Sequence, residues 1–96
     1  MIRSACRRSG SAWNHGGVDL LEALGTVMHE RRRQLGLSQE TLAFETEIHR
    51  TYISAIERGT KGGRNPSLRV VERLAEGLDM ELPKFLRRMA KVIEED

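Results

Sequence analysis

The chain has one cysteine, two prolines, two phenylalanines, one tyrosine and one tryptophan among its 96 residues. The lone cysteine, Cys6, excludes an internal disulfide and a multi-cysteine metal cluster, and it fits a reduced cytosol. Few aromatic residues beside abundant Leu, Ile, Val, Ala and Met favour helix over sheet. The composition therefore predicts a single all-α domain.

Long apolar runs are absent as well. No segment reaches the length needed to span a membrane, and the N-terminus lacks the apolar block of a signal peptide. No glycine-rich phosphate loop follows a strand, and His15, His29 and His49 have no ligand-like spacing with Cys6. We therefore expect a soluble cytoplasmic protein with no membrane partner, no metal, no cofactor and no enzymatic activity.

The charge is small, with a formal net value of +2. This value alone is weak support for a polyanionic partner. Residues 36–59 are even slightly acidic, because they hold two arginines and four glutamates. Attraction to nucleic acid would have to come from Arg50, Arg58, the loop that follows them, and helix N-termini.

Hydrophobic periodicity, capping residues and breakers predict five helices. The first begins after Asp19, with Glu22 completing a capping box, and ends at Gly36. The others begin after Ser38, after Ile48 or His49, after Ser67, and at Glu81-Leu82-Pro83. Leu68 is expected in the apolar stripe of the fourth helix. Residues 1–18 lack periodicity and are expected to be a flexible tail, which leaves residues 19–96 as the domain.

The middle of the chain, SQETLAFETEIHRTYISAIERG over residues 38–59, has the pattern of two short helices joined by a tight turn. Ile53 and Ile56 form the inward-facing pair of the second of these helices. The segments HERRRQLGLSQETLA, HRTYISAIERG and RNPSLRVVERLAEGLDM together resemble the Cro/lambda-repressor-type helix-turn-helix family, also called the xenobiotic-response-element family. The resemblance covers about residues 22–86. It implies a five-helix domain that binds double-stranded DNA as a dimer, with its third helix in the major groove.

The resemblance also implies roles for particular residues. Gln39 matches a glutamine that contacts phosphate and supports the helix in the groove. Arg50, Thr51 and Ser54 match groove-facing positions, and Arg50 is the candidate for a bidentate contact with guanine. Ala55 lies beside them.

Further positions follow from the same resemblance. Thr51 and Ala55 suit a thymine methyl group, whereas Tyr52 and Arg58 suit phosphate. Arg32 and Glu57 match a structural ion pair that ties the first helix to the third.

The chain departs from the family pattern in three places. The tight-turn position, commonly glycine, is Glu47, so we expect the turn to open slightly. The position before Arg50, often serine, is His49, a poorer helix cap but a candidate groove or phosphate contact. The loop TKGGRNPS is longer than usual, and Lys61 and Arg64 in it could neutralise phosphate. A flexible solvated loop is an equally good interpretation.

The last helix is expected to leave apolar side chains for a second subunit. So small a domain has little left to cover them. The dimer interface is therefore placed at Phe85, Met89, Val92 and Ile93.

The sequence thus indicates a sequence-specific transcriptional regulator, acting as a homodimer on an inverted repeat. Small restriction-modification controllers have this size and plan. One alternative is an antitoxin that regulates its own operon and binds a toxin protein. A third hypothesis is a fold kept only for contact with another protein. Toxin and RNA polymerase are the candidate protein partners.

Overall fold

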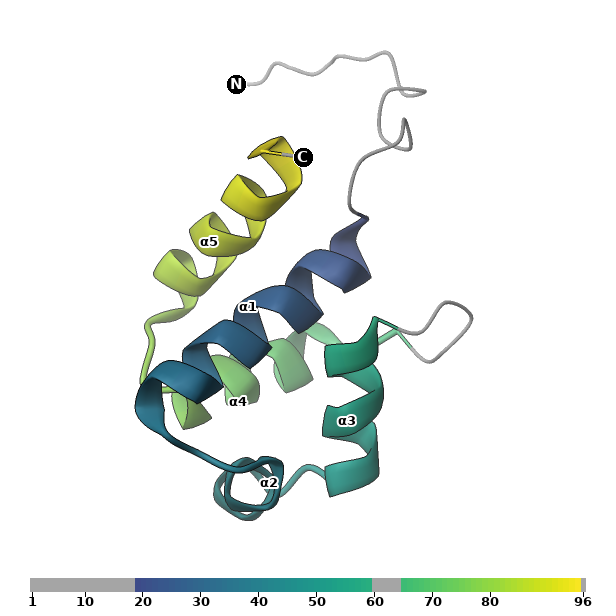
Figure 1. Cartoon of the computed structure of the whole chain (residues 1–96), viewed down its shortest axis with the longest axis vertical. Coiled ribbons are helices and arrows are strands. Elements are labelled where there is room, and N and C mark those ends of the chain that lie inside the picture. The colour runs from purple at the N-terminus through teal and green to yellow at the C-terminus, as the bar shows by residue number, and fades with distance from the viewer. Residues whose placement is uncertain (1–18, 60–64, 96) are drawn as a thin grey trace.

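The computed structural model describes residues 19–59 and 65–95, which form five helices and no strand. The helices are α1 (Leu20–Leu35), α2 (Gln39–Thr46), α3 (Arg50–Arg58), α4 (Leu68–Gly77) and α5 (Leu82–Glu95) (Figure 1). The predicted all-α fold is confirmed. None of the helices within these residues is long and apolar enough to cross a membrane. The predicted tail, residues 1–18, lies outside the described residues.

Side-chain caps set most of the helix boundaries, as the sequence predicts. The Asp19 carboxylate accepts a hydrogen bond from the Glu22 N–H at 2.8 Å, and the Asp19 N–H donates to the Glu22 carboxylate at 3.2 Å. Ser38 and Ser67 cap α2 and α4 through bonds of 3.0 and 3.1 Å. These bonds satisfy backbone donors that have no partner inside the helix.

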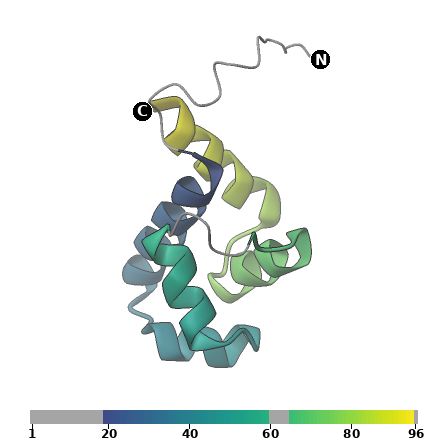
Figure 2. The same cartoon turned by 90° about the vertical axis from the view of Figure 1, so that its right-hand side faces the viewer.

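The helices enclose one core, with α1 in contact with both α3 and α5, and α2 in contact with α3 and α4 (Figures 1 and 2). Each helix places its apolar stripe into this space. The largest fully buried side chains come from all five helices and from the residue that directly follows α4, Leu78: Leu24, Val27, Met28, Leu42, Ile53, Leu74, Leu78 and Phe85. The position of α3 is therefore fixed by packing on α1 and α2.

The α1–α3 contact depends on Gly25. A Cβ atom at this position would lie 2.4 Å from the Ile56 carbonyl oxygen and 3.0 Å from that of Glu57. These are backbone atoms of α3, so they cannot move aside as the end of a flexible side chain can. Only glycine therefore lets α1 and α3 cross this closely.

Replacing Gly25 with alanine should therefore destabilise the protein by about 1–3 kcal/mol through overpacking. Alanine would otherwise gain roughly 1 kcal/mol in helix propensity. Urea unfolding measures the difference, and Thr26→Ala, at the exposed neighbouring position, is the control. Equal stability of the two variants would show that α1 and α3 can separate without cost.

Two expectations about apolar residues are wrong. Phe85 and Met89, expected at the dimer interface, are 0% and 5% exposed in the single chain, because α1 packs along α5 and covers them. Leu68, expected in the core, is 85% exposed. It lies in the first turn of α4, ahead of the buried residues Val71, Leu74 and Ala75 of that helix.

Candidate nucleic-acid interface

The connection between α2 and α3 is held by Thr46. Its hydroxyl donates to the Leu42 carbonyl at 2.8 Å and accepts the Ile48 N–H at 3.3 Å. Thr46 is 5% exposed, so both bonds are protected from water. Ile48 is also buried, and it anchors the connection in the core.

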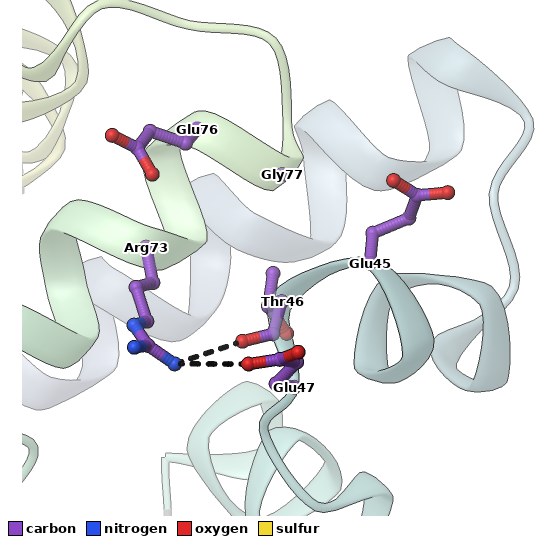
Figure 3. A pocket seen from close by; sticks show the side chains of 6 residues that line it. All are labelled: Glu45, Thr46, Glu47, Arg73, Glu76 and Gly77. Carbon is purple, nitrogen blue, oxygen red and sulfur yellow. Dashed lines mark hydrogen bonds and ion pairs between the residues drawn. The ribbon is translucent and has the colours of Figure 1, made fainter.

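Glu47 takes the left-handed conformation at this turn, with φ 61° and ψ 28°. The slight opening expected for a residue other than glycine is therefore not seen. The cost of roughly 1 kcal/mol is offset by the bonds of Thr46. The Arg73 guanidinium of α4 also lies 3.4 Å from the Thr46 carbonyl oxygen and 3.8 Å from the Glu47 carboxylate (Figure 3).

A hollow lies between this turn and α4. It is lined by Glu45, Thr46, Glu47, Arg73, Glu76 and Gly77 (Figure 3). Three glutamates and one arginine line it, so its charge is unsuited to a phosphate. No group of three or more His, Cys, Asp or Glu within the described residues is placed to hold a metal ion.

The first turn of α3 presents its side chains to solvent. Arg50 and Thr51 are exposed, and the Arg50 guanidinium makes no hydrogen bond or ion pair with residues 19–59 or 65–95. His49 caps the helix, because its Nδ1 atom accepts the Thr51 N–H at 3.2 Å. The backbone donors of this turn carry partial positive charge, which favours a phosphate nearby.

The other predicted groove residues follow along the same helix. Arg50, Ser54 and Arg58 are four residues apart and so lie on one face. The Ser54 hydroxyl accepts a hydrogen bond of 2.7 Å from Arg58, which orients that guanidinium along the helix. Tyr52 is half-buried and packs against the core. Ala55 is half-buried on α3; Lys61 and Arg64 lie outside the described residues.

Glu57 connects α3 to the two preceding helices. Its carboxylate accepts bonds of 2.8 and 3.0 Å from Arg32 of α1, and one of 3.1 Å from Gln39 of α2. The Nδ1 atom of His29 lies 3.2 Å from the same group. The sequence indicated the pair of Arg32 and Glu57. It missed His29, whose position one turn before Arg32 on α1 was the available signal.

This arrangement keeps Glu57 ionised. Burial raises the pKa of its carboxyl group, since only 5% of the side chain is exposed. The hydrogen bonds from Arg32, Gln39 and His29, with the charge of Arg32, outweigh burial and hold the pKa below its ordinary value. The bond with Glu57 correspondingly raises the pKa of Arg32.

Comparison with known proteins gives consistent matches. The sequence profile of the helix-turn-helix family matches residues 28–85. The chain is 50% identical over 60 residues to the control protein C.BamHI of Bacillus amyloliquefaciens, covering 62% of this chain and 69% of that protein. It is 38% identical over 71 residues to the control protein C.SmaI of Serratia marcescens, covering 74% and 81%.

Solved structures agree. The wild-type restriction-modification controller protein C.Esp1396I superposes with a TM-score of 0.72 at 32% identity, covering 80% of this chain and 96% of that one. The same protein as a tetramer on its natural 35 base-pair operator gives a TM-score of 0.70 at 33% identity, covering 78% and 95%. The chain belongs to the helix-turn-helix family of DNA-binding proteins, in the Cro/lambda-repressor-type class that its motifs resemble.

Proposed function

We propose that this chain is a sequence-specific transcriptional regulator of the restriction-modification controller type. It binds double-stranded operator DNA as a homodimer, with one copy of α3 in the major groove at each half-site. The observation that carries the proposal is the first turn of α3, where an exposed Arg50 and an exposed Thr51 project from a helix fixed by Glu57 and Gly25. The likeness to a controller solved on its operator supports it. A protein with this role works in the cytoplasm.

Within that complex, the residues divide into two kinds of contact. Arg50 and Thr51, with Ser54 and Ala55 beside them, face the base edges. Gln39, Tyr52 and Arg58 lie toward the phosphate backbone, and Lys61 and Arg64 are further candidates for phosphate. His49 is a candidate for either the groove or a phosphate. Because Gln39 donates one amide hydrogen to Glu57, its second amide hydrogen can be given to DNA.

DNase footprinting on the sequence upstream of the chain's own reading frame tests the proposal. Specific binding should give a protected inverted repeat at about 100 mM salt, where non-specific binding is weak. A scrambled duplex of the same length and composition is the control. Equal protection of the two duplexes would contradict sequence-specific recognition.

The dimer interface is proposed on the outer face of α5. Leu86 and Ile93 are 45% and 37% exposed, and Ala90, also exposed, lies between them, so the three form a stripe at i, i+4 and i+7. Val92 is half-buried at the edge of the core. A two-fold symmetric dimer would bring two such stripes together and fix the spacing of the half-sites.

Ile93→Glu should weaken dimerisation by about 100-fold or more, since two-fold symmetry places the carboxylate in the interface twice. Analytical ultracentrifugation measures the dimer dissociation constant. Leu68→Glu is the matched control, because Leu68 is an even more exposed apolar residue on a different helix. A dimer that survives Ile93→Glu but not Leu68→Glu would move the interface to α4.

The antitoxin alternative depends on the basic N-terminal segment, which lies outside the described residues. The relatives reported above are named as controllers. The relatives therefore support a controller over an antitoxin.

A further inference from the structure

The histidine that caps α3 uses only one of its two ring nitrogens in the fold. Nδ1 of His49 lies 3.2 Å from the backbone nitrogen of Thr51 and 2.7 Å from the Thr51 hydroxyl oxygen. A backbone N–H can only donate a hydrogen bond, so Nδ1 must be the acceptor. Nδ1 therefore carries no proton while the cap is formed.

This bond fixes the hydrogen-bonding character of the whole ring. In a neutral imidazole, one nitrogen carries the proton and the other accepts. With Nδ1 accepting, the proton lies on Nε2, on the far side of the ring from the cap. His49 is exposed, and Nε2 makes no hydrogen bond or ion pair with the residues that the structure describes. The ring thus offers solvent a donor and no acceptor.

We propose that His49 is a contact residue for DNA that donates a hydrogen bond from Nε2–H to an acceptor atom of the duplex. The inference rests on the proposed function, because it needs the first turn of α3 to face DNA. The acceptor is a phosphate oxygen or an acceptor on a base edge, both of which the ring can reach from a helix N-terminus in the groove. A donor group of DNA, such as the amino group of adenine or cytosine, is rejected at this position.

His49 differs from an ordinary helix cap. A serine or asparagine at this position could accept the Thr51 N–H equally well. Both side chains are shorter than histidine, and neither places a donor at the position of Nε2. Histidine is a poorer cap than either residue, so capping alone does not explain its presence. A hydrogen bond donated from Nε2 does.

Two variants keep the cap and leave no donor at the position of Nε2, because the serine O–H and the asparagine N–H lie nearer the backbone. His49→Asn and His49→Ser both retain an oxygen that accepts the Thr51 N–H, so their melting temperatures should equal or exceed that of the wild type. Their affinity for a duplex selected by the wild-type protein from random DNA should fall by about tenfold, the worth of a hydrogen bond at each half-site. His49→Gln reaches farther with an amide N–H but caps poorly. Its melting temperature should fall by ~4 °C or more, while it keeps most of the affinity.

The measurements are thermal unfolding and fluorescence anisotropy over a range of salt concentrations. If the acceptor is a phosphate, His49→Asn and His49→Ser weaken binding equally on every sequence. If it is a base, the loss is confined to duplexes that keep one particular base pair. Wild-type affinity in both cap-keeping variants would overturn the proposal and leave His49 as a cap only. Failure of the wild-type protein to select any duplex would instead overturn the proposed function itself.

Discussion

Replacing Glu57 with alanine is expected to lower the free energy of unfolding by about 3–5 kcal/mol, the cost of breaking a buried ion pair from one side. The side chains of Glu57 and Arg32 are only 5% and 13% exposed. Without the carboxylate, the Arg32 guanidinium loses two hydrogen bonds in a site that water hardly reaches, and Gln39 loses its partner as well. For a domain whose whole stability is about 5–15 kcal/mol, this is a large fraction.

Chemical unfolding of the two proteins at neutral pH measures the loss. Glu72→Ala is the matched control, since Glu72 pairs with Arg69 at 3.7 Å across an exposed part of α4. That pair is worth at most about 1 kcal/mol. If Glu57→Ala lowered the free energy of unfolding no more than Glu72→Ala, the contacts of Glu57 would contribute little to stability. DNA affinity should fall with the folded fraction, while the order of preferred bases stays unchanged.

The same carboxylate gives the stability a pH dependence of definite sign. Because the folded pKa of Glu57 lies below its ordinary value of 4.5, the ionised group stabilises the fold above that pH. The contribution is lost as the pH falls below 4.5 and through the lower folded pKa. The difference in unfolding free energy between the wild type and Glu57→Ala should therefore shrink on acidification. A difference that grew in acid would contradict the assignment.

The sequence predicted the elements of this fold well because their ends are set by local chemistry. Asp19, Ser38 and Ser67 accept bonds from N–H groups three residues later, and Gly36 and Gly59 take positive φ at helix ends. Such signals lie within a few residues of each other in the chain. Each can be recognised before the tertiary structure is known.

The features that the sequence could not predict are contacts between helices that lie far apart in the chain. Periodicity placed Phe85 and Met89 on one face of α5, but it could not say that α1 would cover that face. Arg31 shows the same limit. The sequence places it in the last turns of the first helix, but it cannot show that the guanidinium donates to the carbonyls of Leu78 and Asp79 at 2.9 and 3.1 Å. Those residues are far along the chain, and Asp79 is itself at positive φ, with no glycine to mark the turn.

The residues of the candidate interface also differ in how far the sequence alone could predict them. Family resemblance assigns Arg50, Thr51 and Ser54 to the groove by their order in one short motif. The internal bonds of His49 and Ser54 depend on side-chain geometry, and they change what these residues can offer DNA. Arg50 differs from both, because the described residues leave its guanidinium without a hydrogen bond or ion pair. It is therefore the side chain on α3 from which the largest loss of base preference is expected.

Arg50→Ala should weaken binding to the selected operator by at least about 30-fold. A bidentate contact with guanine is worth about 1–3 kcal/mol, and a homodimer makes it at both half-sites. Binding to a scrambled duplex should change little, so that the ratio of specific to non-specific affinity collapses. Arg50→Lys should restore little of this ratio, because lysine keeps the charge but lacks the planar fork of two donors. Fluorescence anisotropy on both duplexes provides the measurement.

Arg58→Ala is the control on the same helix face. Arg58 is hydrogen-bonded to Ser54, and its guanidinium is proposed to contact phosphate. Its loss should weaken binding to all sequences alike and should lower the slope of log affinity against log salt by roughly 1 for each subunit. The two variants thus separate recognition of bases from attraction to the backbone. If Arg50→Ala behaved as Arg58→Ala is expected to behave, with a uniform loss and a reduced salt slope, Arg50 would be a phosphate contact. The base preference of α3 would then have to reside in Thr51, Ser54 and Ala55.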